Sequence, residues 1–206
     1  MTIAHFHPQP VTLQTNDICL RPLRLDDAQG FYRAGNYPEL WRWVKPNQCS
    51  SLAQTQTWLT ASLEKQAQGL HLLFVILDNQ SQTLIGSTRF CAINLMDKTV
   101  EIGFTFITPK FQRSHVNTQA KYLLLKHAFE QWRVNRVQLR THEQNTASRK
   151  AIARIGGQFE GIIRHHRILA DGSVRNTAVF SVIDPEWPIV KRKLEVMMSA
   201  AIEKVS

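Results

Sequence analysis

Three segments of the chain carry side chains whose types and spacing could do chemistry. The first is the alternating run EIGFTFI, which begins at Glu101, and the others are the polar segments 112–118 and 142–148. A carboxylate beside a reacting amine can take its proton directly or through water, and partial burial raises the pKa of a carboxylate toward the range this role needs. Glu101 is therefore a candidate general base. The alternative is a solvated carboxylate at a strand edge.

Segment 112–118 stands between a predicted strand and a predicted helix. The strand alternates, with one face formed by Ile102, Phe104 and Phe106, and Pro109 ends it because proline cannot donate to a sheet ladder. Apolar residues then return at helical spacing, as Leu124, Leu125, Ala128, Phe129 and Trp132. Free N–H groups and the dipole at a helix start favour anions, so this segment is a predicted phosphate site. Asn117 or Thr118 is the predicted N-cap.

The remaining pattern predicts one α/β domain over residues 11–206, after a short tail at residues 1–10. Strands are expected at 17–23, 70–78, 83–90, 99–107, 136–141, 159–169 and 174–183. Helices are expected at 25–35, 51–68, 147–155 and 187–205, in addition to the one after residue 118. The Asp-Gly turn at 170–172 marks a hairpin. The last helix is expected to pack on the body or on a partner subunit.

Composition favours a soluble, reduced protein. The chain has 206 residues, of which 43% are apolar and 20% charged, which fits one globular domain. No apolar run approaches the roughly 18 residues of a membrane span, and the N-terminus lacks a signal-peptide pattern. The cysteines are Cys19, Cys49 and Cys91, an odd number without metal-type spacing. We therefore expect a cytoplasmic protein with no metal and no membrane partner.

The net charge of +9 lies in the second half of the chain. Residues 101–206 hold 17 Lys and Arg against 9 Asp and Glu, whereas residues 1–100 hold 8 against 7. Such a surface suits a phosphate-bearing ligand, and it would suit RNA equally. No nucleic-acid motif accompanies the charge, so direct nucleic-acid binding is not expected.

Several basic residues have two readings. Arg113 and Lys121 could reach a phosphate, although a solvated charge is the preferred interpretation of Lys121. Arg149, Lys150 and Arg154 form a stripe on the predicted helix 147–155, which is either a phosphate contact or a solvated face. The adjacent pair His165 and His166 is not a metal site, because neighbouring strand residues point to opposite faces.

The order of strand, proline-containing turn, Gln-Arg loop and long helix resembles the acetyl-CoA-binding core of the GNAT superfamily of N-acetyltransferases. The runs EIGF, QRSHVNTQAKYLLLKHAFE and RVQLRTHEQNTASRKAIARIGGQFEG are similar to the branch of ribosomal-protein N-terminal (alanine or serine) acetyltransferases. The resemblance spans roughly residues 18–187. It implies a mixed, mostly antiparallel sheet, flanked by helices and splayed around the Glu101 strand.

The resemblance also implies the reaction and the residues that serve it. Acetyl-CoA would be the co-substrate, and its acetyl group would pass directly to a primary amine. Asn145 would hold the pantetheine arm and Ser148 would protonate the leaving thiolate, as the general acid; a simple helix cap is the alternative for both. The predicted cofactor-binding set is completed by Phe104, Phe106, Ile107, Gln112, Arg113, Ser114, His115, Val116, Asn117 and Thr118.

One part of the loop departs from the family pattern. His115 and Asn117 stand where the family usually has glycine or alanine, and glycine lets the backbone approach phosphate closely. The sequence therefore leaves open an inactive acyl-CoA-binding or ribosome-associated protein of the same fold. The acceptor, a protein N-terminus or a small molecule, also stays open. Candidate acceptor contacts are Tyr37, Trp41, Trp43, Arg140 and His142, and family habit suggests a homodimer.

Overall fold

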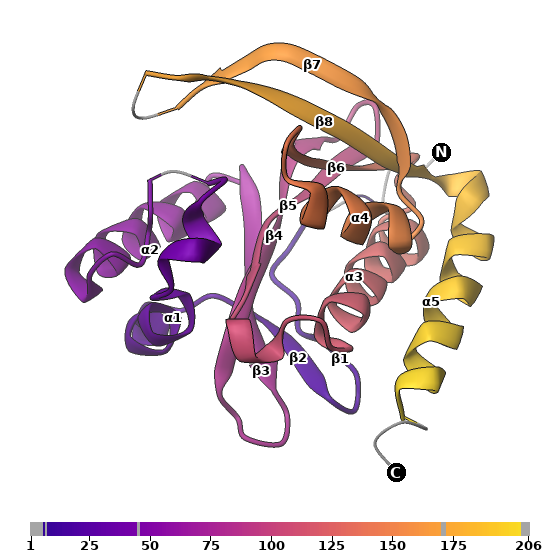
Figure 1. Cartoon of the computed structure of the whole chain (residues 1–206). Helices are drawn as coiled ribbons and strands as arrows, with labels where there is room; N and C mark the ends of the chain where they lie inside the picture. Colours follow the sequence, from indigo (N-terminus) through magenta and orange to yellow (C-terminus); the bar gives the residue numbers. More distant parts are fainter. Residues whose placement is uncertain (1–5, 7, 45, 170–171, 203–206) are drawn as a thin grey trace.

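The protein is built on one open sheet. The structure, a computed structural model, describes residues 6, 8–44, 46–169 and 172–202. Eight strands lie in the order β1-β2-β3-β4-β5-β6-β8-β7 (Figure 1). Every neighbouring pair is antiparallel except β5 and β6. The predicted α/β fold with a mixed, mostly antiparallel sheet is confirmed.

Seven strands follow the predicted order with shifts at their ends, and the two-residue strand β1 was not predicted. Their bounds are β1 (Leu13–Gln14), β2 (Ile18–Pro22), β3 (His71–Asp78), β4 (Leu84–Asn94), β5 (Thr99–Ile107), β6 (Arg136–His142), β7 (Gln158–Ile168) and β8 (Val174–Ile183). The predicted hairpin turn at 170–172 falls partly outside the described residues. Most of the predicted tail does so too, but Phe6 packs on Trp132 with ring centroids 5.6 Å apart.

The helices cover both faces of the sheet. Their bounds are α1 (Ala28–Gly35), α2 (Leu52–Ala67), α3 (Val116–Lys126), α4 (Thr146–Arg154) and α5 (Trp187–Ile202). Short 3-10 turns occur at η1 (Leu25–Asp27), η2 (Pro38–Trp41), η3 (Pro109–Phe111) and η5 (Asp184–Glu186), and a π-helical turn, η4 (His127–Gln131), continues α3. Among the described residues no helix is long and apolar enough to cross a bilayer.

Two hydrophobic cores lie on opposite sides of the sheet. Side chains of β3 alternate between them: Phe74 joins the core under α3 and α5, while Val75 joins the core under α1 and α2. A strand buried on both faces reads as a continuous apolar run, which explains the segment HLLFVILD. Figure 1 shows α1 and α2 on one side of the strands and α3 and α5 on the other.

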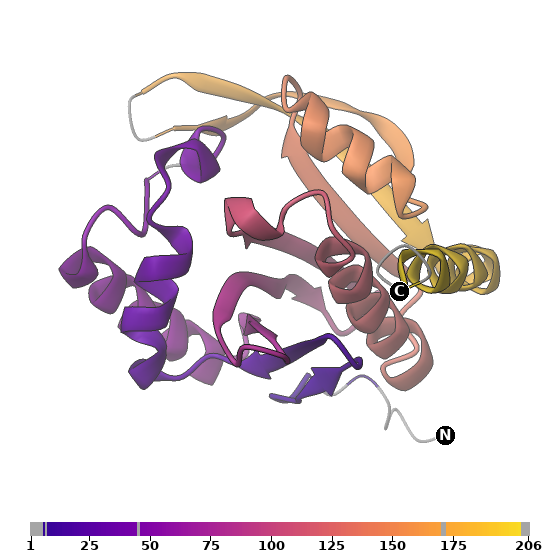
Figure 2. The same cartoon turned by 60° about the horizontal axis from the view of Figure 1, so that its bottom comes forward.

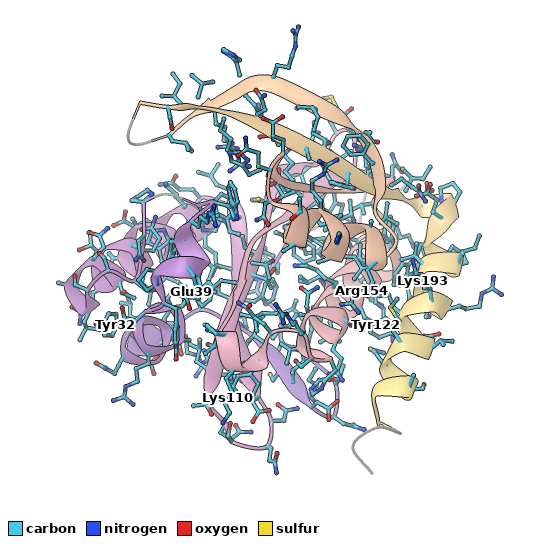
Figure 3. All side chains as sticks on the ribbon, in the orientation of Figure 1. Tyr32, Glu39, Lys110, Tyr122, Arg154 and Lys193 are labelled. Carbon is cyan, nitrogen blue, oxygen red and sulfur yellow. The ribbon has the colours of Figure 1, made fainter. Side chains whose placement is uncertain are left out.

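The closing helix packs on the body of the protein. Trp187, Val190 and Leu194 are buried in the core of the α3 side. Tyr122 of α3 donates a hydrogen bond of 2.9 Å to Glu195, while Lys193 lies on the exposed side of α5 (Figure 3). The last helix was predicted to pack either on the body of the protein or on a partner subunit, and its packing on the body is confirmed. The side chain of Ala201 and residues 203–205, also predicted for this helix, lie outside the described part.

The hairpin of β7 and β8 forms an arm. Its outer part extends past β6 toward the segment that holds α1 and α2 (Figure 1; Figure 2). Arg175 of β8 reaches that segment, because its Nη1 lies 3.4 Å from the carbonyl oxygen of Trp43. The arm therefore spans one face of the central strands.

Candidate active site

A β-bulge at Phe104 interrupts the central strand β5. Ser87 pairs with Phe106 and Arg89 pairs with Gly103, so Phe104 and Thr105 together oppose Thr88. Phe104 has φ +52°, a left-handed backbone that is uncommon for a residue other than glycine. Phe104 is 46% exposed. The Arg89 guanidinium lies over the Phe104 ring, with the Arg89 Cζ atom 3.3 Å from the centroid of that ring.

The bulge corrects one prediction about this strand. Ile102, Phe104 and Phe106 were expected on one face, but Ile102 packs in the α3 core and Phe106 in the α1 and α2 core. An inserted residue shifts the two-residue period, so every later side chain changes face. Even-numbered side chains of β5 therefore point to the α3 side before the bulge and to the α1 and α2 side after it.

The pairing of β5 with β6 stops beside Glu101. Only Thr99, Val100 and Glu101 pair with β6, opposite Arg136, Val137 and Gln138. Both strands continue beyond this point, β5 to Ile107 and β6 to His142, without pairing to each other. Their facing backbone N–H and C=O groups are available to a ligand there, because unpaired backbone groups seek partners. The predicted splay around the Glu101 strand is confirmed.

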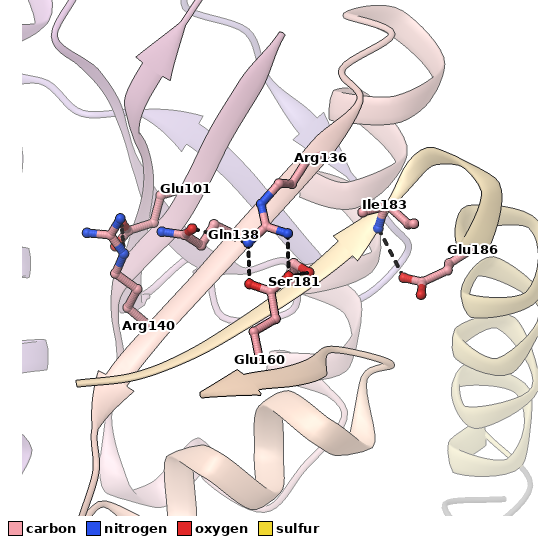
Figure 4. A network of polar contacts seen from close by, with 8 residues as sticks. All are labelled: Glu101, Arg136, Gln138, Arg140, Glu160, Ser181, Ile183 and Glu186. Atoms are coloured by element: carbon pink, nitrogen blue, oxygen red, sulfur yellow. Dashed lines mark hydrogen bonds and ion pairs between the residues drawn. The ribbon is translucent and has the colours of Figure 1, made fainter. Parts of the chain in front are cut away.

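Glu101 is buried at the point of divergence. Its residue is 7% exposed, and its carboxylate lies beside Gly103, where an added Cβ would stand 3.0 Å from Oε1. The Nε of Arg140 lies 3.3 Å from Oε2 (Figure 4). Burial raises the pKa of Glu101, and Arg140, Arg167, Arg89 and Arg175 oppose the rise. The alternative of a solvated strand-edge carboxylate is wrong, because β4 and β6 flank this strand.

Segment 112–118 forms a tight entry to α3. The Ser114 hydroxyl donates to the carbonyl of Phe111 at 2.6 Å and accepts from the N–H of Val116 at 3.3 Å. Gln112 donates its amide to the carbonyl of Ile107 at 2.9 Å. The helix begins at Val116 with His115 as N-cap, so the prediction of a cap at Asn117 or Thr118 is wrong.

The two residues that replace the family's small residues fit this backbone without strain. His115 has φ −67° and ψ −21°, ordinary helical values, and Asn117 lies inside α3. The left-handed position of the loop is Arg113, with φ +59°. A non-glycine residue at positions 115 and 117 therefore carries no backbone penalty.

The predicted cofactor residues divide by what their side chains contact. Ile107 and Val116 lie in the α3 core and Phe106 in the opposite core, so only their backbone can face a ligand. The Thr118 hydroxyl accepts a 3.0 Å hydrogen bond from Arg154 of α4 (Figure 3). Exposed or half-buried side chains are Phe104, Gln112, Arg113, Ser114, His115 and Asn117.

Asn145 and Ser148 lie at the start of α4. The Asn145 side chain accepts from the backbone N–H of Ser148 at 3.0 Å, so Asn145 is the N-cap. The Ser148 hydroxyl is left for another partner. Because β5 and β6 are parallel, the starts of α3 and α4 that follow them lie at the same end of the sheet, and Arg154 joins the two helices (Figure 2).

Lys121 was predicted to be a solvated charge, and this prediction is wrong because the residue is buried. It is 5% exposed, and its Nζ donates to Thr105 Oγ1 at 2.6 Å and lies 3.4 Å from Thr88 Oγ1. Burial lowers the pKa of Lys121 to about 7. Its position three residues before Leu124 on the apolar stripe was the available signal.

The comparisons with known proteins agree with this geometry. Residues 17–158 match the family model described as an acetyltransferase (GNAT) domain. The chain belongs to the GNAT acetyltransferase family. The uncharacterized N-acetyltransferase p20 of Bacillus licheniformis is 22% identical over 176 residues, which cover 85% of this chain and 98% of that protein.

Solved GNAT structures share the whole fold. A putative acetyltransferase from T. thermophilus has 32% identity and a TM-score of 0.79, with 93% of this chain and 99% of that chain covered. RimJ of Mycobacterium smegmatis, solved in complex with CoA-disulfide, has a TM-score of 0.79 at 19% identity, with 91% and 95% covered. At that identity the likeness to RimJ concerns the fold alone.

The sequence did not predict which arginines surround Glu101. Arg140 was an unranked candidate, and Arg89, Arg167 and Arg175 were not singled out. Arg89 stands in β4 next to the buried core residue Phe90, which was a weak signal, whereas the neighbours of Arg175 are not buried. Among the described residues, no group of three or more His, Cys, Asp or Glu is placed to hold a metal.

Proposed function

We propose that this GNAT protein transfers an acetyl group from acetyl-CoA directly to a primary amine, with Glu101 as general base. One observation carries the proposal: a buried carboxylate of raised pKa stands where β5 and β6 part, three residues before the bulge at Phe104. A carboxyl whose pKa is raised toward neutrality is a better proton acceptor for an ammonium group than a solvated one. Titratable groups perturbed in this way gather at active sites.

The residues supply a complete set of proton transfers. Glu101 takes a proton from the acceptor ammonium, and the amine nitrogen then attacks the thioester carbonyl carbon. Unpaired backbone N–H groups of β5 near Phe104 stabilise the oxyanion. The C–S bond breaks as the carbonyl re-forms, and the Ser148 hydroxyl gives a proton to the departing thiolate. The acylated nitrogen then loses its second proton, which returns through solvent to the Ser148 oxygen. The amine displaces the thiolate directly, so no covalent enzyme intermediate is needed.

The two helix starts supply the grip on coenzyme A. We assign its phosphates to the N-terminal turn of α3 with Gln112, Arg113, Ser114, His115 and Asn117, and the pantetheine arm to Asn145. Helix N-termini favour phosphate through their free N–H groups and dipole. The ordinary backbone of His115 supports a loop that still binds, and RimJ, which shares the fold, was solved in complex with CoA-disulfide.

Calorimetric titration with acetyl-CoA tests the proposal first. We expect a Kd of about 1–100 μM, or roughly −8 to −5.5 kcal/mol. A matched control is N145A, which removes the amide contact while leaving the α3 loop intact, and it should bind more weakly than wild type. Absence of binding would contradict the proposal. Binding without transfer to any amine or peptide would favour an inactive acyl-CoA-binding protein.

The acceptor class is open between a protein N-terminus and a small amine. The p20 relative is described as an N-acetyltransferase without a stated acceptor. The Trp43 and His142 rings are in tilted contact, with centroids 4.7 Å apart, and His142 shares a face of β6 with Arg140, which contacts Glu101. We place the acceptor on this face, and the residues that line it limit its chemistry.

A further inference from the structure

Five neighbouring strands bring charged side chains together around Glu101. In sheet order they are Arg89 of β4, Glu101 of β5, Arg140 of β6, Arg175 of β8 and Arg167 of β7. The four arginines all act on the charge of Glu101. We call these arginines, together with His166 of β7, the arginine face.

Several donors of the arginine face lack acceptors among the described residues, although Nη1 of Arg175 contacts the carbonyl oxygen of Trp43. Four buried nitrogens have no hydrogen-bond partner among the described residues: Nε of Arg89, Nε of Arg140, Nε of Arg175 and Nδ1 of His166. The 3.3 Å contact of Arg140 with Glu101 is an ion pair without hydrogen-bond geometry. Buried polar atoms are nearly always paired, so four orphans at one place need an explanation.

A neighbouring arginine shows what a satisfied pair looks like in the same sheet. Arg136 stands four residues before Arg140 on β6, and its guanidinium binds the Glu160 carboxylate, with Nη1 2.5 Å from Oε1 (Figure 4). Ser181 also donates to Glu160 at 2.7 Å. The protein thus pairs Arg136 with a carboxylate, whereas the Nε atoms of Arg89, Arg140 and Arg175 have no such partner among the described residues.

The charge of the arginine face is also unbalanced. The charge of Glu101 acts on both Arg89 and Arg175, and four guanidinium groups act on Glu101. Arg167 pairs directly opposite Arg175, an arrangement of like charges that destabilises a hairpin. Burial lowers the pKa of both Arg89 and Arg175. A bound anion would remove both the imbalance and the orphaned donors.

An anion bound at the arginine face would lie at a different place from the coenzyme phosphates. Glu101 and Arg140 lie on the face opposite the core residues Ile102 and Leu139, and α3 packs on those core residues. The phosphate site at the start of α3 therefore lies on the other side of the sheet. Two members of the arginine face, Arg167 and Arg175, belong to β7 and β8, the strands of the arm, which Figure 1 shows extending toward the segment of α1 and α2.

We propose that the arginine face binds a carboxylate of the acceptor, so that the substrate is a primary amine with a carboxylate a few bonds from its nitrogen. This inference rests on the proposed function, which requires the amine beside Glu101. Arg140 touches Glu101, so a carboxylate held by the arginines lies close to the reacting nitrogen. Guanidinium groups bind carboxylates through two parallel hydrogen bonds, which suits a planar acidic group.

Matched acceptor pairs test the substrate class. One arm compares free amino acids with their α-amides, with rates expressed per free amine because the amide lowers the pKa of the amine. The other arm compares peptides that begin Ala-Glu with peptides that begin Ala-Gln, which distinguishes a free amino acid from an acidic protein N-terminus. We expect kcat/KM to be about 10- to 100-fold higher for the carboxylate member in one arm, the range expected for hydrogen bonds to a charged group.

R175Q and R164Q form the matched pair of variants. Arg175 belongs to the arginine face, whereas Arg164 is exposed on β7 and is not among the charges that act on Glu101. R175Q should raise KM for the carboxylate acceptor about tenfold or more, leave its amide partner and the Kd of acetyl-CoA unchanged, and not lower the melting temperature. R164Q should behave as wild type.

The outcomes separate the inference from the proposed function. Equal use of carboxylate and amide acceptors, equal effects of the two variants, or a loss of acetyl-CoA affinity in R175Q would overturn the inference while transfer itself remains. If no amine is acetylated, the proposed function fails. Calorimetric binding of the same acceptor pairs then decides the inference alone, because a carboxylate preference that R175Q abolishes would still support the arginine face.

Discussion

Glu101 and Lys121 are buried charged residues of opposite sign that serve opposite faces of β5. Glu101 is 7% exposed and stands among four arginines, whereas Lys121 is 5% exposed and, within the described part of the chain, hydrogen-bonds to the hydroxyls of Thr105 and Thr88. Burial raises the pKa of the carboxyl and lowers that of the amine, to about 7. Burial alone therefore does not identify a catalytic group. The surroundings do, because only Glu101 faces unpaired backbone and unpartnered donors.

Substitution of Glu101 should give the largest effect. E101Q keeps the shape of the side chain and removes the base, so we expect kcat/KM to fall by roughly 100- to 10,000-fold. In wild type the rate should fall as pH drops through a pKa above the usual glutamate range, because protonated Glu101 cannot accept a proton. A pH-rate profile should show that acidic limb in wild type and lack it in E101Q. A limb that persists in E101Q would assign the base to another group.

Substitution of Lys121 should change stability and leave the chemistry nearly untouched. The folded pKa of about 7 lies below the usual lysine value, so the unfolded chain binds a proton that the folded chain lacks between about pH 7 and 10.4. Stability of wild type should therefore rise with pH across that window. K121M should be more stable than wild type at pH 6 by about 1–3 kcal/mol, because it avoids burying a charge without a carboxylate partner.

Denaturant unfolding at pH 6 and pH 9 measures this difference. The advantage of K121M should shrink at pH 9, where the neutral amine costs less to bury. Loss of activity in K121M, with intact stability, would show instead that Lys121 takes part in catalysis. The proposed difference between a catalytic Glu101 and a non-catalytic Lys121 would then be wrong.

Removal of the Ser148 hydroxyl should have a moderate effect. S148A is expected to lower kcat by about 10-fold or more, a threshold set below the roughly 100- to 10,000-fold that general acid–base catalysis usually contributes. The backbone N–H that Asn145 caps is unchanged, so stability should stay as in wild type. N145A is the opposite control, since losing the cap should cost about 1 kcal/mol of stability. If S148A turns over normally, the cap alone accounts for this pair.

Cys91 should matter least, although it pairs with Glu101 across β4 and β5. Burial and the neighbouring Glu101 raise the pKa of the Cys91 thiol to about 12, so no thiolate forms near neutral pH. C91A should change kcat by less than about threefold, as direct transfer requires. An acetylated cysteine trapped by mass spectrometry would contradict direct transfer.

Local patterns predicted the elements because their physics is local. The alternation at the start of β5 and the apolar stripe of α3 each act within a few residues. Whole-chain resemblance added the splay between β5 and β6. The alternation failed only after Phe104, because a bulge depends on the partner strand and not on the residue itself.

The sequence by itself determined the strand and helix order, the identity of the candidate base and the helix starts that favour phosphate. The tertiary structure decided which charges are buried and which are paired. Lys121 became a core residue because α3 turns it under the bulge, and the arginines met because five strands bring distant positions together. Cross-strand neighbours come from chain segments tens of residues apart, so no local spacing in the chain encodes their meeting.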